Sequence, residues 1–352
     1  MHHRLGRILL AMLVVAALGS TVVLGGCKSG EKSLVSFWPK ADKERVVPKP
    51  AEPPRWPLTG LDAPSEEATH LRVVSVKIEN SPEARPQTNL QMADVVYESV
   101  TEGGITRFNC IFQSQSPDII GPVRSARLSD LYIVPEYNAL FVFSGASSSV
   151  NSRVNQSGID NLSEDAGISY PFSRSSSRPR PHNLYLTLSK LREESVKRKM
   201  DQTQNLTGFA FDRTAVEATA SPVAGISIPF STANKVDWTY DAASNTYLRV
   251  NNGKKFMDAA TNKQVSARNV VVLWAQHKTA SRDKVGSVTY EIILKGSGQC
   301  AVFRNGQRFD GTWETDGTKP PSFRAQDGTL IKLSPGNTWF QVVQPSVNIA
   351  MK

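Results

Sequence analysis

The apolar positions divide the chain into one long leading run and many shorter ones. Residues 8–24 form an uncharged, mostly apolar segment behind a short basic start that contains Arg4 and Arg7. Residues 28–57 then contain prolines at intervals that no helix tolerates, with charged and small residues between them. From residue 58 onward, apolar runs of strand and helix length alternate with turn residues. The pattern predicts a leader over residues 1–27, a proline-rich tether over residues 28–57 and a folded head.

The first half of the head, residues 58–214, has the pattern of a mixed domain. Apolar runs predict strands at 72–78, 94–101, 105–113 and 138–144, with Glu102-Gly103-Gly104 as a hairpin signal between the middle two. Helical spacing predicts a short turn at 88–93, a helix from near Ser125 that stops before Pro135, a helix over 148–156 closed by Gly158, and a helix over 188–200. Residues 172–181, rich in serine, proline and arginine, predict an exposed loop.

The second half of the head, residues 215–352, has no helical period of any length. Short strand-like runs lie at 236–240, 246–250, 269–275, 287–294 and 300–304. Asn252-Gly253, Gly296-Ser297-Gly298 and Asn305-Gly306 separate runs of this kind as turns. We therefore expect the α+β fold class, with a mixed α/β N-terminal domain followed by a mostly β C-terminal domain.

The leader ends in Leu24-Gly25-Gly26-Cys27, which is the pattern of a lipoprotein signal peptide with its lipobox. Cleavage would leave Cys27 as a lipidated N-terminus, and two acyl chains such as palmitate hold a protein stably on a membrane. The alternative is an uncleaved membrane helix, for which the run lies at the lower edge of the required length. The lipobox predicts a lipid-anchored protein on the extracytoplasmic face of the cell membrane, and the tether would reach about 90 Å if fully extended.

Charge and cysteine content narrow the classes of partner. The net charge is +9, or +7 once the leader with Arg4 and Arg7 is removed, and this excess favours anionic polymers or membrane surfaces of the cell envelope. A location outside the cytosol excludes nucleic acid as the partner. Two cysteines remain beside the lipidated one. Cys110 and Cys300 could pair in an oxidising compartment, or Cys110 could be a small core residue of a strand, and the sequence leaves both open.

Arg124 and Arg127 form the most suggestive pair, since they lie three residues apart at the predicted helix start. A helix N-terminus attracts anions, and arginine forks match carboxylate or phosphate oxygens. With Arg107 they are the candidate anion-binding residues. The alternative is structural, with Arg127 paired to Asp130 and Arg124 bracing a loop.

His182 is the second candidate, because histidine exchanges protons near neutral pH. It could work with an acidic partner such as Glu102 or Asp130 in an envelope hydrolase or transferase, or its ring could fix a turn. Glu102 could instead pair with Arg107 across the hairpin. The sequence has no zinc, calcium or phosphate-loop motif and implies neither a metal nor a cofactor. The tryptophans of the second half are expected in its core.

Several short segments, in this order, resemble the YerB family of bacterial lipoproteins, which has a domain of unknown function. They are Glu102-Gly103-Gly104-Ile105-Thr106-Arg107, Gly121-Pro122-Val123-Arg124-Ser125-Ala126-Arg127, Pro181-His182-Asn183-Leu184-Tyr185, Asn269-Val270-Val271-Val272 and Pro335-Gly336-Asn337-Thr338-Trp339. The resemblance implies a secreted, lipid-anchored protein with N- and C-terminal halves, and no settled activity. We expect a non-catalytic module that binds an anionic envelope polymer or a membrane protein, and keep the His182 enzyme as the alternative.

Overall fold

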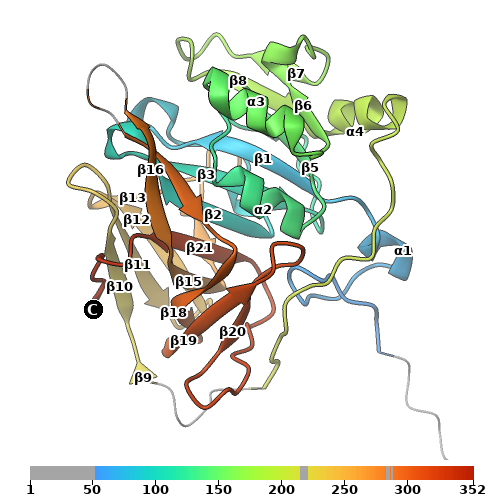
Figure 1. Ribbon diagram of the computed structural model, residues 1–352. Helices are drawn as coiled ribbons and strands as arrows, with labels where there is room; N and C mark the ends of the chain where they lie inside the picture. Colours follow the sequence, from blue (N-terminus) through green and yellow to red (C-terminus); the bar gives the residue numbers. More distant parts are fainter. Residues whose placement is uncertain (1–51, 215–220, 283–285, 287) are drawn as a thin grey trace, which may run out of the picture. The chain divides into compact units, whose positions relative to one another are not determined.

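The computed structural model describes residues 52–214, 221–282, 286 and 288–352, which belong to one compact unit (Figure 1). The leader, Cys27 and most of the expected tether lie outside the described residues. In the described part, no helix has the length and apolar character to cross a membrane. Trp56 is buried in the head, and the backbone of Arg55 forms an isolated antiparallel β-bridge with that of Asp62. The last residues assigned to the tether therefore pack with the fold.

The helices are α1 (Glu66–Thr69), α2 (Asp130–Glu136), α3 (Ser148–Gln156) and α4 (Leu188–Lys197), with 3₁₀ turns η1 (Pro82–Ala84), η2 (Leu90–Met92), η3 (Glu102–Gly104) and η4 (Glu164–Ala166). The strands of the first half are β1 (Val74–Glu79), β2 (Val95–Val100), β3 (Thr106–Phe112), β4 (Ile119–Ile120), β5 (Leu140–Phe143), β6 (Asn161–Ser163), β7 (Phe172–Arg174) and β8 (Leu184–Thr187). Those of the second half are β9 (Ser221–Pro222), β10 (Gly225–Pro229), β11 (Lys235–Asp241), β12 (Thr246–Asn251), β13 (Lys254–Lys255), β14 (Ser266–Ala267), β15 (Asn269–Trp274), β16 (Gln276–Arg282), β17 (Val288–Ile293), β18 (Gly296–Arg304), β19 (Gln307–Thr315), β20 (Ser322–Arg324), β21 (Thr338–Val343) and β22 (Ala350–Met351).

One 11-stranded sheet runs through both halves of the head. Its order is β20-β19-β18-β15-β21-β2-β3-β1-β5-β6, with β9 added beside β19. The halves meet where β2 pairs in parallel with β21, from Val95 opposite Thr338 to Ser99 opposite Val342. The described chain is mostly β, with a mixed first half and a β second half. The domain boundary between residues 214 and 215 stays a prediction.

A second sheet, in the order β13-β12-β11-β10-β22 with β14 beside β12, is built from the second half alone. Large aromatic side chains pack between it and the central sheet, and Trp238 of β11 meets Trp339 of β21 with ring centroids 5.2 Å apart. Trp238, Trp313 and Trp339 are buried, as expected for core residues, and Trp274 is half-buried. Buried aromatic side chains bring large apolar areas into a core and dominate its stability.

A fully buried ion pair lies inside this aromatic layer. Arg249 of β12 donates from Nη1 and Nη2 to the two carboxylate oxygens of Glu98 on β2, both at 2.8 Å, and neither side chain is exposed. Four aromatic rings lie 4.6–5.5 Å from the guanidinium carbon, those of Phe108, Trp238, Phe256 and Trp339. The pair therefore joins the second sheet to a strand of the first half.

The start of the head is tied to both halves by backbone hydrogen bonds. Pro57 accepts from the Phe209 amide at 3.0 Å, and Thr59 accepts from the Gly336 amide at 2.7 Å. Gly60 accepts from Arg213 Nη2 at 2.8 Å. Residues 57–60 therefore form a strap that is fixed to two distant segments of the chain.

Two local expectations are wrong. The helix expected from Ser125 begins at Asp130 and includes Pro135, because residues 124–126 use their backbone in other pairings: Arg124 N–H donates to Lys77 O, and Ala126 N–H to Gly145 O. The turn expected at residues 296–298 is the start of β18. The strand can pack this closely only with a glycine at position 298. A Cβ there would lie 2.6 Å from both the Trp274 carbonyl oxygen and Trp313 Nε1 and would clash with them.

Other expectations are confirmed. The helix over residues 148–156 has the expected bounds, with Gly158 in the left-handed region after it. β2 and β3 form the expected hairpin. The loop expected at 172–181 is only partly confirmed, because residues 172–174 form the short strand β7. Cys110 and Cys300 are buried free thiols that belong to different core clusters.

Breaking the central ion pair tests its contribution. Arg249→Met would leave the Glu98 carboxylate buried without its cation, and we expect the free energy of unfolding to fall by about 3–5 kcal/mol. Glu98→Gln/Arg249→Met removes both charges and should be clearly more stable than the single variant. Urea unfolding measures both, and a single variant within about 1 kcal/mol of the wild type would contradict the assigned role.

Glu136, at the end of α2, gives a pH test. Burial raises the pKa of its carboxyl to about 8, from 4.5, although the Tyr97 hydroxyl donates to it at 3.4 Å. The folded protein keeps this proton while the unfolded chain loses it above pH 4.5, so the Glu136 contribution to stability falls as pH rises from 4.5 to about 8. The slope is at most about 1.4 kcal/mol per pH unit. Glu136→Gln should remove this component, which unfolding curves across that range would show; an unchanged pH dependence would refute the assignment.

Candidate functional site

Several strands of the central sheet end at the same edge. β1, β5 and β6 are parallel neighbours, and β1 and β2 are both antiparallel to β3. The carboxyl ends of β1, β2, β5 and β6 therefore lie along one edge, where the segments that follow them begin. In sheets with parallel strands, ligands bind outside the carboxyl ends of the strands. This edge is the candidate functional site.

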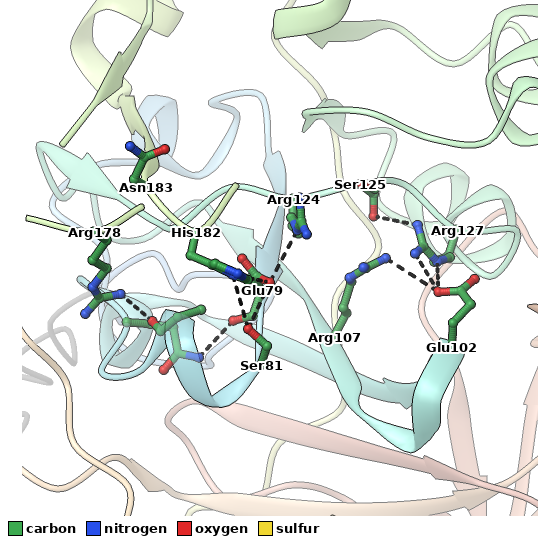
Figure 2. A network of polar contacts seen from close by, with 12 residues as sticks. Glu79, Ser81, Glu102, Arg107, Arg124, Ser125, Arg127, Arg178, His182 and Asn183 are labelled. Atoms are coloured by element: carbon green, nitrogen blue, oxygen red, sulfur yellow. Dashed lines mark hydrogen bonds and ion pairs between the residues drawn. The ribbon is translucent and has the colours of Figure 1, made fainter. Parts of the chain in front are cut away.

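A loop of residues 121–129 crosses this edge. Arg124 N–H donates to Lys77 O at 2.8 Å, and Ser144 N–H donates to Arg124 O at 3.0 Å, so the loop is held between β1 and the end of β5. Arg124 and Arg127 point from the loop toward the sheet, and Arg107 at the start of β3 points toward the loop (Figure 2). The three candidate arginines thus meet at one edge.

Glu79, at the end of β1, holds the left-hand group in Figure 2. His182 Nδ1 lies 2.9 Å from Glu79 Oε1, Ser81 Oγ donates to the same oxygen at 2.9 Å, and Arg124 Nε lies 3.3 Å from it. The Glu79 side chain is 2% exposed, and those of His182 and Arg124 are 18% and 23% exposed. A buried carboxylate therefore positions a histidine and an arginine near the surface.

Glu102, in the hairpin turn η3, holds the right-hand group. Arg127 donates from Nε and Nη2 to Glu102 Oε2 at 3.0 and 2.6 Å, while Arg107 Nη1 is 3.9 Å from that oxygen. Thr289 of β17 donates to Glu102 Oε1 at 3.0 Å. Arg127 thus has the close ion pair, and Arg107 has a distant one.

Beneath the arginines lies a fully buried polar group on Asp130. Lys77 Nζ donates to Asp130 Oδ1 at 2.7 Å, Asn109 Nδ2 donates to the same oxygen at 3.0 Å, and the Arg127 amide donates to Oδ2 at 2.7 Å. The Lys77 and Asp130 side chains are 1% and 0% exposed. Asp130 is therefore satisfied within the fold and positions the crossing loop through its backbone.

The polar edge continues along β5, β6 and β8. Arg174 Nη2 donates to both Glu164 carboxylate oxygens at 2.8 and 3.0 Å, and Ser144 Oγ donates to Glu164 Oε2 at 2.9 Å. Asn183, next to His182, accepts from Arg174 Nη1 at 3.1 Å. The segment expected as an exposed loop therefore contributes Arg174, and His182 directly after it joins the same connected polar surface.

The structure changes the partners that the sequence suggested. Arg127 pairs with Glu102, and only its backbone reaches Asp130. The acidic partner of His182 is Glu79, and neither Glu102 nor Asp130. The helix begins only at Asp130, so no helix N-terminus lies at Arg124 to attract an anion. The roles of these residues stay predictions.

Sequence reasoning missed Glu79 and Lys77, although a signal was present. The strand Val74–Glu79 alternates strictly, with Val74, Val76 and Ile78 on one face and Ser75, Lys77 and Glu79 on the other. A strand that is buried on both faces and still has two charged positions requires partners for them. That requirement would have marked this face of β1 as a polar site.

In the residues that the structure describes, no group of three or more His, Cys, Asp or Glu side chains is placed to hold a metal ion.

Comparison with known proteins adds the family. Residues 58–201 match the family model "Protein of unknown function (DUF3048) N-terminal domain", and residues 226–340 match the corresponding C-terminal domain. The Bacillus subtilis protein named "Putative lipoprotein YerB" is 29% identical over 305 residues, which cover 85% of this chain and 88% of that protein. The crystal structure of YerB from Bacillus subtilis superposes with a TM-score of 0.76 at 27% identity, covering 84% of this chain and 99% of that one. The chain belongs to the YerB-like family, with its N- and C-terminal DUF3048 domains.

Proposed function

We propose that the head is a non-catalytic module that binds a phosphate- or carboxylate-bearing polymer of the bacterial envelope through Arg107, Arg124 and Arg127. The chain is held on the extracytoplasmic face of the cell membrane by a lipid on Cys27. A membrane-protein partner is the competing class of ligand, and the binding experiment below separates the two.

The observation that supports this proposal most is the state of Arg107. Its side chain is 9% exposed, and its Nε and Nη1 atoms have no hydrogen-bond partner among the described residues. Its ion pair with Glu102 is long, at 3.9 Å. Buried donors without partners are costly, and a cationic group leaves the largest deficit. An incoming anion oxygen would remove that deficit.

The charges around Arg107 have the sign that an anion needs. Lys77, Arg107, Arg124 and Arg127 face only three carboxylates in their ion pairs, those of Glu79, Glu102 and Asp130. Among these four cations and three carboxylates, one positive charge is therefore in excess. Because the three arginines are half-buried or buried, an anion between them would be screened less by salt than one on an open surface.

Two features support the envelope as the location. The lipobox before Cys27 predicts lipidation, and the name of the related Bacillus subtilis protein describes a lipoprotein. The net charge of +7 that remains once the leader with Arg4 and Arg7 is removed favours the anionic polymers of that compartment. A chain anchored by its lipid would present the arginine edge outside the cytosol.

A second function, an envelope hydrolase or transferase, is favoured by the contact of His182 Nδ1 with Glu79 at 2.9 Å. An ionised carboxylate at Nδ1 holds the proton on that nitrogen and leaves Nε2 as an acceptor, which is the arrangement of a general base. His182→Gln separates the two functions: it would abolish catalysis and leave polymer binding largely intact.

Replacing the half-buried arginines tests the binding function. Arg124→Ala/Arg127→Ala should weaken retention on purified cell-wall material by at least about tenfold, since each lost charge-assisted hydrogen bond contributes roughly 1.5–3 kcal/mol. Retention is measured as a function of salt, with wall material that keeps its phosphate polymers and with material stripped of them. Arg198→Ala/Arg324→Ala removes the same charge from exposed positions and is expected to bind normally.

Unchanged, salt-insensitive retention of the arginine variant would reject the arginine edge as the binding site. Equal retention on stripped and unstripped walls would reject the anionic polymer and favour a protein partner. Circular dichroism of each variant establishes that the fold is intact.

The lipid anchor has a separate test. Cys27→Ser removes the thiol that would accept the lipid, so fatty-acid labelling should disappear and mature anchoring should fail. Metabolic labelling with a fatty acid, followed by membrane fractionation, measures both. Equal labelling of the variant would show that Cys27 is not the acceptor.

A further inference from the structure

A cavity of about 440 Å³ lies between the two halves of the head, and the arginine edge does not use it. The segment that leaves β1 contributes Arg85 and Pro86, and the β12–β13 hairpin with the residues after it contributes Asn251, Lys254, Lys255 and Phe256. Ligand sites occur preferentially at such junctions, as mostly apolar hollows with a few placed polar groups.

The cationic side of the cavity is built around Arg85. Its Nε donates to Asn80 Oδ1 at 2.9 Å and its Nη2 to the Asn80 carbonyl at 2.8 Å, which fixes the guanidinium 5.6 Å from the centre of the Phe256 ring. Burial and the nearby Arg249 lower the pKa of Arg85 to about 10, while the carboxylates of Glu98 and Glu83 act on it in the opposite direction. Lys254 and Lys255 are exposed at the mouth.

No acidic residue is among those that line the cavity, all of which are described. Glu83 lies on the same segment, but it is exposed and its carboxyl interacts chiefly with its own backbone and with Ser81. Three cations without a lining carboxylate suit a phosphate, whose oxygens accept from an arginine fork and from lysine ammonium groups.

Asn251 gives an independent indication of a ligand. Its side chain is in a residue only 3% exposed, and its Nδ2 donates to Asn234 Oδ1 at 2.7 Å and to the Lys235 carbonyl at 3.0 Å. Its Oδ1 has no hydrogen-bond partner in the described structure. A buried amide oxygen without a donor is rare in native proteins, and a small shift of the Asn251 side chain toward the cavity that this residue lines would let a hydroxyl of a bound molecule satisfy it.

The remaining wall is apolar. Phe256 is 3% exposed, and Met257, Pro82 and Pro86 complete the lining. Such a wall gains affinity from an apolar body and gives nothing to inorganic phosphate. The cations thus match a phosphate, the amide oxygen matches a hydroxyl, and the wall matches an apolar body of the same ligand.

We propose that this cavity binds a hydroxyl-bearing phosphate ester with an apolar body, the phosphate lying at Arg85, Lys254 and Lys255 and the hydroxyl at Asn251 Oδ1. The ligand would contact both halves of the head. This site is independent of the arginine edge, and either can fail without the other.

The test uses the chain from Lys28 to Lys352, which contains the whole compact unit, and titration calorimetry with three soluble probes. Dihexanoylphosphatidylglycerol has all three ligand features, glycerol phosphate lacks the apolar body, and dihexanoylphosphatidylcholine lacks net charge and hydroxyl donors. We expect the first to bind at least about tenfold more tightly than either of the others, since each missing feature removes one class of contact.

Lys254→Ala/Lys255→Ala should weaken binding of the phosphatidylglycerol by about tenfold or more, because it removes two phosphate partners from exposed positions without touching the core. Lys319→Ala/Lys332→Ala removes the same charge from exposed positions outside the cavity lining and should bind like the wild type.

Three results would overturn the proposal: no binding of the phosphatidylglycerol, equally tight binding of glycerol phosphate, or equal losses in the two lysine variants. The second would mean that the apolar wall contributes nothing to affinity. The third would mean that general positive charge, and not this cavity, attracts the anion.

Discussion

The two halves of the fold are joined by a charged contact placed where water cannot reach it. The Arg249–Glu98 pair connects the second sheet to β2, and β2 is the strand through which the first half joins β21 of the second half. Removing two charges from water is expensive, and only good geometry with further contacts offsets the cost. Here two hydrogen bonds of 2.8 Å and four surrounding aromatic rings provide them. A misplaced β2 would leave both ions buried and unpaired, so the contact favours one register.

The charged side chains on the central sheet are fully paired in the interior and incompletely paired at the carboxyl edge. In the interior, Asp130 and Lys77 are paired at 2.7 Å and Asn109 completes the hydrogen bonds. Toward the carboxyl edge the pairing becomes incomplete, and Arg107 is left with a carboxylate at 3.9 Å. The inner Asp130–Lys77 pair therefore has a structural role. The outer Arg107 keeps a positive charge that no close carboxylate balances. This gradient is the physical basis for the proposed anion site.

Sequence patterns predicted what is local. The helix over residues 148–156 was recoverable because Ser147 caps it and Gly158 closes it, and the β2–β3 hairpin because its turn residues lie between two apolar runs. The helix expected at Ser125 was wrong because tertiary backbone contacts to Lys77 and Gly145 hold those residues extended. The β2–β21 pairing joins strands some 240 residues apart, which no local pattern encodes. The site residues were found by type, but their partners depend on which strands become neighbours. The alternation in β1 was the one local signal for Glu79 that was available.

The strap of residues 57–60 has a mechanical consequence. Tension along the tether would reach the head through the bonds of Pro57 with Phe209, Thr59 with Gly336 and Gly60 with Arg213, which grip two separate stretches of chain at once. The force would thus be divided between these two stretches and would not detach one terminal strand by itself. A head attached in this way would keep a definite orientation toward whatever pulls on it.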